Sequence, residues 1–306
     1  MMHIFLFGTG YSAHYFIKAL RSNPAVNIRS ITSITGTTRS AAQADILRDN
    51  GITPVLFDAE QGLNAELRDE LSQATHIISS IAPVSSRADD PDPVLGLMPE
   101  GLAHYAPQAQ FISYLSTIGV YGDYQGAWVD ERSELKPLSS RSIARITAEQ
   151  QWLAQSSPAI ACSILRIAGI YGPSFHGQAR NALASIQNGR AHRLIKKDHV
   201  FNRIHVADIG GALAHLALNN QGGIYNLADD LPAPAHEIIT YAAGLLGVTP
   251  PPAIDYELAE LSPMARSFYL ECKRASNAAL KATGYQLHYP DYHAGLDALF
   301  AQGEGR

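Results

Sequence analysis

Residues 4–13 (IFLFGTGYSA) constrain the fold of this chain more than any other stretch. Four consecutive apolar residues predict a buried parallel strand, and the residues after the glycines have helical periodicity. Between them lies a G-x-G-x-x-A pattern, in which Gly8 permits a tight turn, Gly10 lets backbone approach a phosphate and Ala13 allows close packing. A strand, a glycine turn and a helix in this order predict a dinucleotide pyrophosphate site.

The predicted helix begins at Tyr11 and Ser12. A helix N-terminus presents backbone N–H groups and a partial positive charge, both of which stabilise a bound anion. Glycine turns between a strand and a helix also occur without any ligand. The dinucleotide interpretation therefore depends on the rest of the chain.

Composition limits the classes of protein that fit. The 306 residues, 46% of them hydrophobic, can bury a large core and predict one or two domains. The net charge is −5 with no basic stripe, which argues against a nucleic-acid partner. The apolar run at 4–7 is too short for a secretion signal, and no run approaches the roughly 20 residues that span a bilayer.

Cys162 and Cys272 are the two cysteines of the chain. Two cysteines form neither a disulfide framework nor a zinc site. No spacing of His, Cys, Asp and Glu resembles a metal site either. We therefore expect a cytoplasmic protein with no metal and no membrane contact.

Alternating strand and helix patterns up to about residue 166 predict an α/β fold with a doubly wound parallel sheet. The expected strands are 4–7, 27–35, 54–57, 76–79, 110–115 and 159–166, and the expected helices are 11–20, 41–49, 65–72 and 140–155. Segments 205–217 and 224–227 read as a helix and a strand that return to this domain. The prediction is a Rossmann NAD(P)-binding domain of residues 1–170 plus 203–228, with a smaller C-terminal substrate lobe of 171–202 plus 229–306.

The residues after the second predicted strand indicate the type of nicotinamide cofactor. A fold that prefers NAD places an acid about 20 residues beyond the glycines, whereas the first acid here is Asp45. Thr37, Thr38 and Arg39 occupy the expected position. Because arginine pairs bidentately with phosphate, this cluster favours NADP over NAD. The alternative is a solvated Arg39 at a helix start that Ser40 caps.

Three further positions are placed by the ends of predicted strands. Asp58 follows the third strand and would meet the adenine. Ser80 and Ala82 follow the fourth and would border the nicotinamide side.

Several later motifs, taken together, resemble the extended short-chain dehydrogenase/reductase family, which contains NAD-dependent sugar epimerases and dehydratases. The resemblance covers nearly the whole chain. In order, the motifs are residues 114–122 (YLSTIGVYG), 165–173 (LRIAGIYGP), 203–209 (RIHVADI) and 224–227 (IYNL). Residues 126–131 (GAWVDE) resemble an atypical subgroup of NADP-binding proteins that lacks a settled reaction.

The resemblance implies a catalytic Ser or Thr, a Tyr that acts as acid or base, and a Lys four residues after the Tyr. Thr117 matches the first role. The other two positions fall on Arg141 and Arg145. Arg145 retains a cation for ribose or phosphate, whereas Arg141 cannot replace a phenol because a guanidinium does not give up its proton near neutral pH.

Other residues could supply the missing acid. Tyr121, Tyr171 and His205 are the candidates. The alternative for the two tyrosines is a packing role, and for His205 it is a hydrogen-bonded histidine at a helix start. The one Y-x-x-x-K match, residues 269–273, lies over 100 residues beyond the position that would place it beside Thr117, and we exclude it.

The predicted substrate is a small polar molecule, with a sugar nucleotide as one example. Candidate residues for binding it are Trp128, Asp130, Glu131, Phe175, His176, Arg180, Lys273, Arg274 and Asn277, and each could equally be an ordinary loop, cap or surface residue. Two functions stay open, an NADP-dependent oxidoreductase or epimerase-like enzyme and a dinucleotide-binding sensor or interaction protein without turnover. The resemblance also implies that helix 140–155 could form a homodimer.

Overall fold

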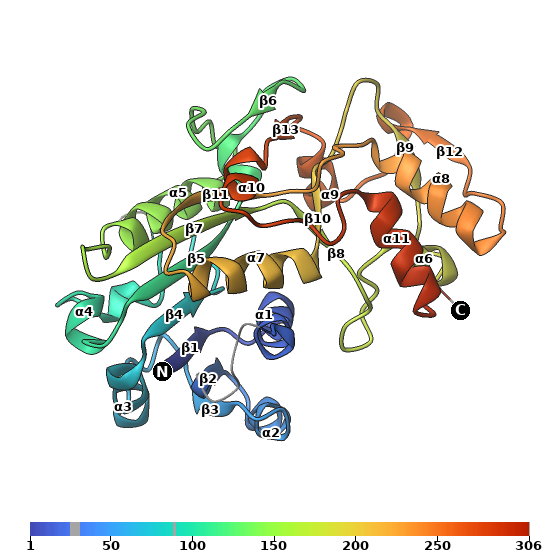
Figure 1. Ribbon diagram of the computed structural model, residues 1–306. Helices are drawn as coiled ribbons and strands as arrows, with labels where there is room; N and C mark the ends of the chain where they lie inside the picture. The colour runs from blue at the N-terminus through green and yellow to red at the C-terminus, as the bar shows by residue number, and fades with distance from the viewer. Residues whose placement is uncertain (25–30, 88–89, 306) are drawn as a thin grey trace. The chain divides into compact units, whose positions relative to one another are not determined.

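The computed structural model describes residues 1–24, 31–87 and 90–305 (Figure 1). The chain forms two compact units. Unit 1 consists of Met1–Val120, Leu138–Arg166 and Ile209–Tyr225, and unit 2 of Tyr121–Pro137, Ile167–Asp208 and Asn226–Arg306. The bounds differ from those of the predicted lobes, chiefly because residues 121–137 pack with unit 2.

The core of unit 1 is a seven-stranded sheet of order β11-β7-β5-β4-β1-β2-β3. Its strands are β1 (Met2–Phe7), β2 (Ile31–Thr38), β3 (Thr53–Leu56), β4 (His76–Ser79), β5 (Phe111–Thr117), β7 (Ala161–Ile167) and β11 (Gly223–Leu227). Strand β1 pairs in parallel with both β2 and β4, so the strand order reverses at β1. This arrangement confirms the doubly wound α/β fold. Residues 27–30 of the strand predicted at 27–35 lie outside the described residues.

Helices cover both faces of this sheet. They are α1 (Tyr11–Ser22), α2 (Ala41–Asp49), α3 (Ala65–Gln73), α4 (Leu102–Tyr105), α5 (Ser140–Leu153) and α7 (Val206–Leu218). Phe5 and Phe7 share one apolar cluster with buried residues of α3, α4 and α5, including Trp152. Ile4 and Leu6 alternate with them and point to the opposite face, which explains why the whole strand is apolar.

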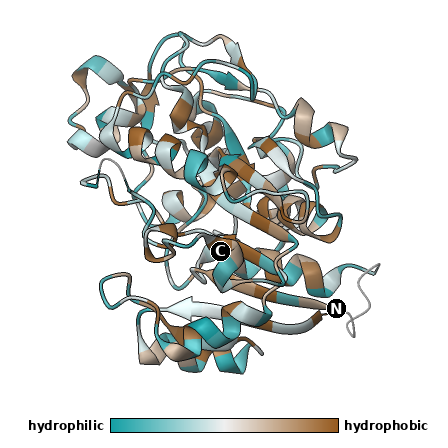
Figure 2. Cartoon of the chain, turned by 90° about the vertical axis from the view of Figure 1, so that its left-hand side faces the viewer, coloured by the Kyte–Doolittle hydropathy of each residue, from teal (hydrophilic) through white to brown (hydrophobic). Residues whose placement is uncertain are grey.

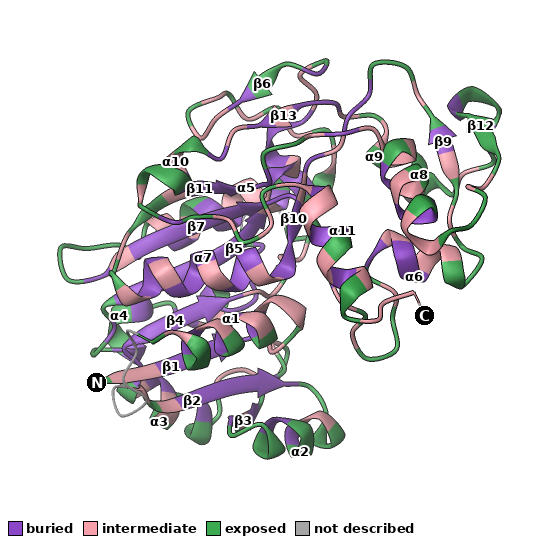
Figure 3. Ribbon diagram, turned by 45° about the vertical axis from the view of Figure 1, so that its right-hand side comes forward, coloured by how far each residue is buried: buried purple, intermediate pink, exposed green. Residues whose placement is uncertain are grey.

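Helices α1 and α7 lie together on the opposite face. A side chain at Gly210 of α7 would lie 2.4 Å from the Tyr15 backbone of α1, so only glycine permits this approach. The His76 ring of β4 bonds to the Ala217 carbonyl of α7 through Nε2 at 3.1 Å. Figure 3 shows the central strands of the sheet as mostly buried, and Figure 2 shows helices that carry both hydrophobic and hydrophilic residues. The sheet and its two helical layers therefore fix the position of the loop after each strand.

Unit 2 contains three two-stranded parallel pairs and a group of helices. The pairs are β6 (Trp128–Val129) with β13 (Arg274–Ala275), β8 (Gly169–Tyr171) with β10 (Arg203–His205), and β9 (Arg193–Ile195) with β12 (Ala253–Asp255). The helices are α6 (Ala182–Gln187), α8 (Ala235–Leu246), α9 (Pro263–Phe268), α10 (Ala278–Ala282) and α11 (Tyr292–Ala301). Leu183, Ile238 and Leu296 bring α6, α8 and α11 into one apolar core.

Candidate functional site

The turn after β1 is held from both neighbouring strands. Gly8 has φ +91°, a conformation that side-chain-bearing residues rarely adopt, and a Cβ there would lie 2.6 Å from Ser80 Oγ. The Gly8 N–H donates to Thr37 Oγ1 at 2.9 Å, and Ser80 Oγ donates to the Gly8 carbonyl at 3.2 Å. Thr9 adds a bond from its hydroxyl to the Thr37 carbonyl at 3.1 Å. Hydrogen bonds with Thr37 of β2 and with Ser80, which follows β4, thus hold the backbone of the glycine turn in place.

Gly10 stands at the N-cap of α1 and has the opposite environment. Its φ is −83°, its position has no side-chain cap, and a Cβ there would meet no atom within 4 Å. Ser12 is half-buried in the first turn, and Tyr11 packs edge-on against Tyr15 with ring centroids 5.4 Å apart. The backbone at the start of α1 therefore borders open space.

Substitution by alanine should have different effects at Gly8 and at Gly10. Gly8→Ala should lower the free energy of unfolding by about 1–3 kcal/mol, because it adds backbone strain and a close contact with Ser80. Gly10→Ala should lower it by less, about 0.5–1 kcal/mol, because alanine is only a poorer N-cap residue there and neither strain nor a close contact applies. Urea denaturation of both variants measures this difference, and equal losses would contradict the assigned roles.

The end of β2 presents one cation to solvent. Thr37 and Thr38 are buried, whereas Arg39 is exposed and makes no hydrogen bond or ion pair with any described residue. Ser40 caps α2 by accepting the Gln43 N–H at 3.2 Å. This is the cap expected if Arg39 is only a solvated residue at a helix start. Asp45, the first acid after the glycines, pairs with Arg48 at 2.6 Å within α2. No acid therefore ends β2.

Two further predicted cofactor positions lie on loops of unit 1. Asp58 is exposed after β3, and its carboxylate accepts the Glu60 N–H at 3.0 Å and the Gln61 amide at 3.1 Å. Ala82 is exposed after β4. Within the described residues, Ser79 Oγ is buried without a hydrogen-bond partner.

Thr117 ends β5 beside the start of α5. Its Oγ1 accepts the Gly119 N–H at 3.1 Å, and the residue is only partly buried. A Cβ at Gly119 would lie 3.5 Å from both Thr117 Oγ1 and Ser142 Oγ, which places the first turn of α5 close to Thr117. Because the Thr117 oxygen accepts this bond, its hydroxyl proton remains for donation.

The two arginines of α5 differ in environment. Arg141 is exposed. Arg145 Nη1 donates to the Tyr114 hydroxyl and to the Leu115 carbonyl, both at 2.9 Å. Burial raises the pKa of Tyr114, so it stays a neutral phenol. Arg145 therefore ties α5 to β5, and its Nη2 and Nε donate to no described residue.

A buried ionic network in unit 1 was missed by sequence reasoning. Glu149 and Arg166 form a salt bridge at 2.8 Å, with side chains only 3% and 4% exposed. Ser116, the residue before Thr117, donates to the same carboxylate at 2.5 Å. The available signal was a charged residue at the end of the apolar strand 161–167. This network fixes the end of β5 and hence the backbone that carries Thr117.

Two further catalytic candidates are buried in unit 2. Tyr121 is fully buried and donates to Asn226 Oδ1 at 2.7 Å. His205 is 3% exposed, and its Nδ1 accepts the Ala207 N–H at 3.2 Å, which leaves the proton on Nε2. Burial, with a smaller effect from His288, lowers the pKa of His205 to about 4. Both environments favour structural roles.

The substrate candidates fall into three groups. Lys273 Nζ donates to the Gly122 carbonyl at 2.6 Å and pairs with Glu271 at 2.7 Å, while Arg274 donates to the Gly126 carbonyl. These bonds attach residues 121–137 to the 271–277 segment, so both cations have structural partners. Six further candidates are exposed or partly exposed: Trp128, Asp130, Glu131, Phe175, His176 and Arg180. Asn277 is buried and donates to Asp230 at 2.7 Å.

The described residues contain no group of three or more His, Cys, Asp or Glu side chains positioned to hold a metal ion. Among the helices of the described segments, none has the length and apolar character needed to cross a membrane.

The fold and the glycine-turn site are those of a Rossmann dinucleotide-fold protein. Residues 8–228 match the model of the NAD dependent epimerase/dehydratase family, and the chain belongs to that family. Among curated proteins, it is 29% identical over 229 residues to Protein YeeZ of Escherichia coli K12, covering 71% of this chain and 77% of that protein.

Two solved structures illustrate the fold. A conserved protein of unknown function from Silicibacter pomeroyi is 38% identical, with a TM-score of 0.81 and coverage of 99% of this chain and 100% of that chain. The human epimerase family protein SDR39U1, solved with NADPH, is 18% identical, with a TM-score of 0.70 and coverage of 99% and 100%. At 18% identity the human structure shows a shared fold only.

Proposed function

We propose that unit 1 binds NADP(H) and that the chain is an oxidoreductase or epimerase/dehydratase-like enzyme for a small polar substrate. The observation that carries the nucleotide proposal is the glycine turn. The two flanking strands fix Gly8 in a left-handed conformation, while Gly10 leaves the N-terminus of α1 open. A pyrophosphate would find N–H groups and a partial positive charge there, with no side chain in its way.

The choice of NADP over NAD depends on the end of β2. Arg39 is an exposed cation without a partner in the described chain. The Asp45 carboxylate already forms an ion pair with Arg48. A 2′-phosphate would supply the anion that Arg39 lacks. The human relative solved with NADPH is compatible with this choice, whereas a Bacillus cereus relative solved with NAD, at 15% identity, has the same fold.

The remaining assignments follow the strand ends. Asp58 would contact the adenine, and Ser80 and Ala82 would border the nicotinamide. Arg145 would reach the ribose with the guanidinium edge that Tyr114 and Leu115 leave unused. The bound nucleotide would accept or supply a hydride. Thr117 would orient the substrate oxygen through its hydroxyl proton.

One observation favours a second function, a dinucleotide sensor without turnover. Helix α5 contains neither tyrosine nor lysine, and exposed Arg141 occupies the expected phenol position. An arginine cannot exchange a proton near neutral pH. A sensor would bind the nucleotide at the same site but would not catalyse a reaction. A nucleotide-binding measurement therefore tests the site for both functions.

Arg39→Ala should weaken NADPH binding by about tenfold to a hundredfold, because a charge-assisted bond to phosphate contributes about 1.5–3 kcal/mol. NADH binding should stay unchanged, because NADH lacks the 2′-phosphate. Fluorescence titration of both nucleotides measures the effect.

Arg48→Ala is the matched control, since it removes an arginine of α2 that already has a partner. An unchanged NADPH affinity in Arg39→Ala, or an equal loss in Arg48→Ala, would remove the 2′-phosphate assignment.

A further inference from the structure

Unit 2 contains a cavity of about 420 Å³ that the proposed nucleotide site does not use. It lies among β8, β10, α6, α8 and α11, all of which belong to unit 2. Its apolar wall includes Ile170, Ile238, Ile239 and Leu296. A cavity of this volume, with apolar walls and a few polar groups, is typical of a small-molecule site.

Arg203 is the charged group of β10 that lines this cavity. Its Nη1 donates to the Phe201 carbonyl at 3.1 Å and to the Ala233 carbonyl at 3.0 Å. These two bonds fix the guanidinium and use both protons of Nη1. Nη2 and Nε donate to no described residue, so three N–H groups remain, and two of them, on Nε and Nη2, form one edge of a fixed, planar cation.

No described carboxylate forms a salt bridge with Arg203. The neighbouring acid, Asp229, accepts the Leu231 N–H at 3.2 Å through Oδ1, and its Oδ2 is buried without a partner in the described chain. Burial raises the pKa of Asp229 to about 7, although Arg203 acts in the opposite direction. The charge of Arg203 is therefore only weakly balanced within the protein.

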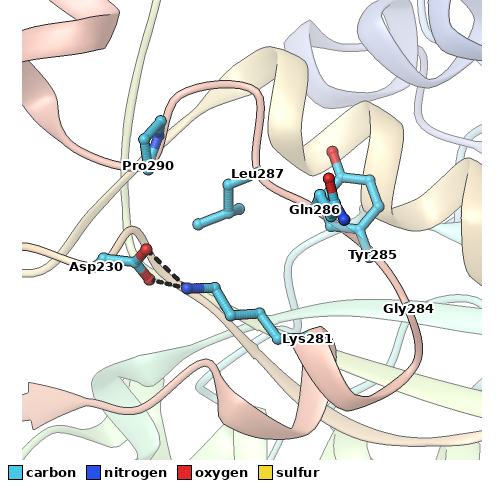
Figure 4. A pocket seen from close by; sticks show the side chains of 7 residues that line it. All are labelled: Asp230, Lys281, Gly284, Tyr285, Gln286, Leu287 and Pro290. Carbon is cyan, nitrogen blue, oxygen red and sulfur yellow. Dashed lines mark hydrogen bonds and ion pairs between the residues drawn. The ribbon is translucent and has the colours of Figure 1, made fainter.

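A second cavity in unit 2 is different. It has a volume of about 350 Å³ and contains Lys281, whose Nζ contacts both carboxylate oxygens of Asp230 at 2.6 and 2.7 Å (Figure 4). Lys281 is already paired with Asp230, so the second cavity lacks a cation without a salt-bridge partner such as Arg203.

We propose that the cavity at Arg203 binds a small molecule through a carboxylate, with an apolar body against Ile170, Ile239 and Leu296. A carboxylate matches the free edge of a guanidinium with two parallel hydrogen bonds. A phosphate dianion fits less well, because Asp229 lies near the fixed guanidinium of Arg203. Arg180 also lines the cavity, but it is exposed and donates to Gln178 Oε1 at 2.8 Å. This proposal does not depend on the nucleotide site.

Benzoate, phenyl phosphate and benzamide are suitable probes, because they share an aromatic body and differ in charge. Ligand-observed NMR titration of the nucleotide-free full chain should show benzoate binding about tenfold or more tighter than benzamide, and tighter than phenyl phosphate. Arg203→Gln should abolish the preference for benzoate over benzamide. Arg190→Gln, which changes an exposed arginine of unit 2 outside the cavity lining, should leave it intact.

Ala182→Trp tests the site without touching Arg203. Ala182 is partly buried in the cavity wall at the start of α6, and tryptophan there should fill the cavity and weaken benzoate binding at least tenfold. If Arg203→Gln does not fold, Ala182→Trp and the comparison of benzoate with benzamide still test the proposed carboxylate site. Equal binding of benzoate and benzamide, tighter binding of phenyl phosphate, or undiminished binding by Ala182→Trp would overturn the proposal.

Discussion

Glu149→Leu is expected to lower the free energy of unfolding of unit 1 by about 3–5 kcal/mol. The substitution removes the Glu149 carboxylate that pairs with the Arg166 guanidinium, whose side chain is 4% exposed. It also removes the acceptor of the Ser116 hydroxyl. Removing one partner of a buried ion pair is strongly destabilising, because the remaining charge stays buried and loses that partner's attraction.

Trp152 is a built-in reporter for this measurement, because it is fully buried in unit 1 and stacks on Tyr114 with centroids 5.9 Å apart. Trp128, the other tryptophan, belongs to unit 2 and would be replaced by phenylalanine. Urea unfolding followed by Trp152 fluorescence then reports unit 1. The double variant Glu149→Leu with Arg166→Met should recover most of the loss, and a single variant as stable as its parent would contradict the assigned role.

Thr117→Val should reduce turnover by about a hundredfold or more, if the chain is an enzyme, and leave NADPH affinity near that of the unchanged protein. The substitution removes a hydrogen-bond donor to the reacting oxygen, an effect of about 10²–10³ on catalytic rates. The assay follows NADPH oxidation with a panel of carbonyl compounds and sugar nucleotides.

Thr147→Val is the matched control for this variant. The Thr147 hydroxyl donates only to the Ile143 carbonyl within α5, at 3.4 Å, so its loss should leave turnover intact. Equal rates in Thr117→Val and the unchanged protein would remove Thr117 from the reaction. If no compound oxidises bound NADPH, the sensor function is supported.

The sequence patterns predicted the elements of unit 1 well because those signals are local. Helix α2 lies at the predicted residues 41–49, and β4 at 76–79. Strand ends were less predictable: β5 continues two residues past the predicted end at 115 and so carries Ser116 and Thr117. His205, expected at a helix start, instead closes β10, because its backbone pairs with Tyr171 in β8.

Pairings between distant residues could not be predicted in this way. The Glu149–Arg166 bridge joins a helix to a strand, and the β6–β13 pairing joins Trp128 to Arg274. Neither partner of such a pair carries a local signal of the other. The structural roles of Lys273 and Arg203 also depend on carbonyl groups far away in the sequence.

The most direct test of the nucleotide proposal is a titration of the unchanged protein with NADPH and NADH under identical salt and pH. The exposed, unpartnered Arg39 and the absence of an acid at the end of β2 predict that NADPH binds about tenfold to a hundredfold more tightly. Equal affinities, tighter NADH binding, or no binding of either nucleotide would contradict it.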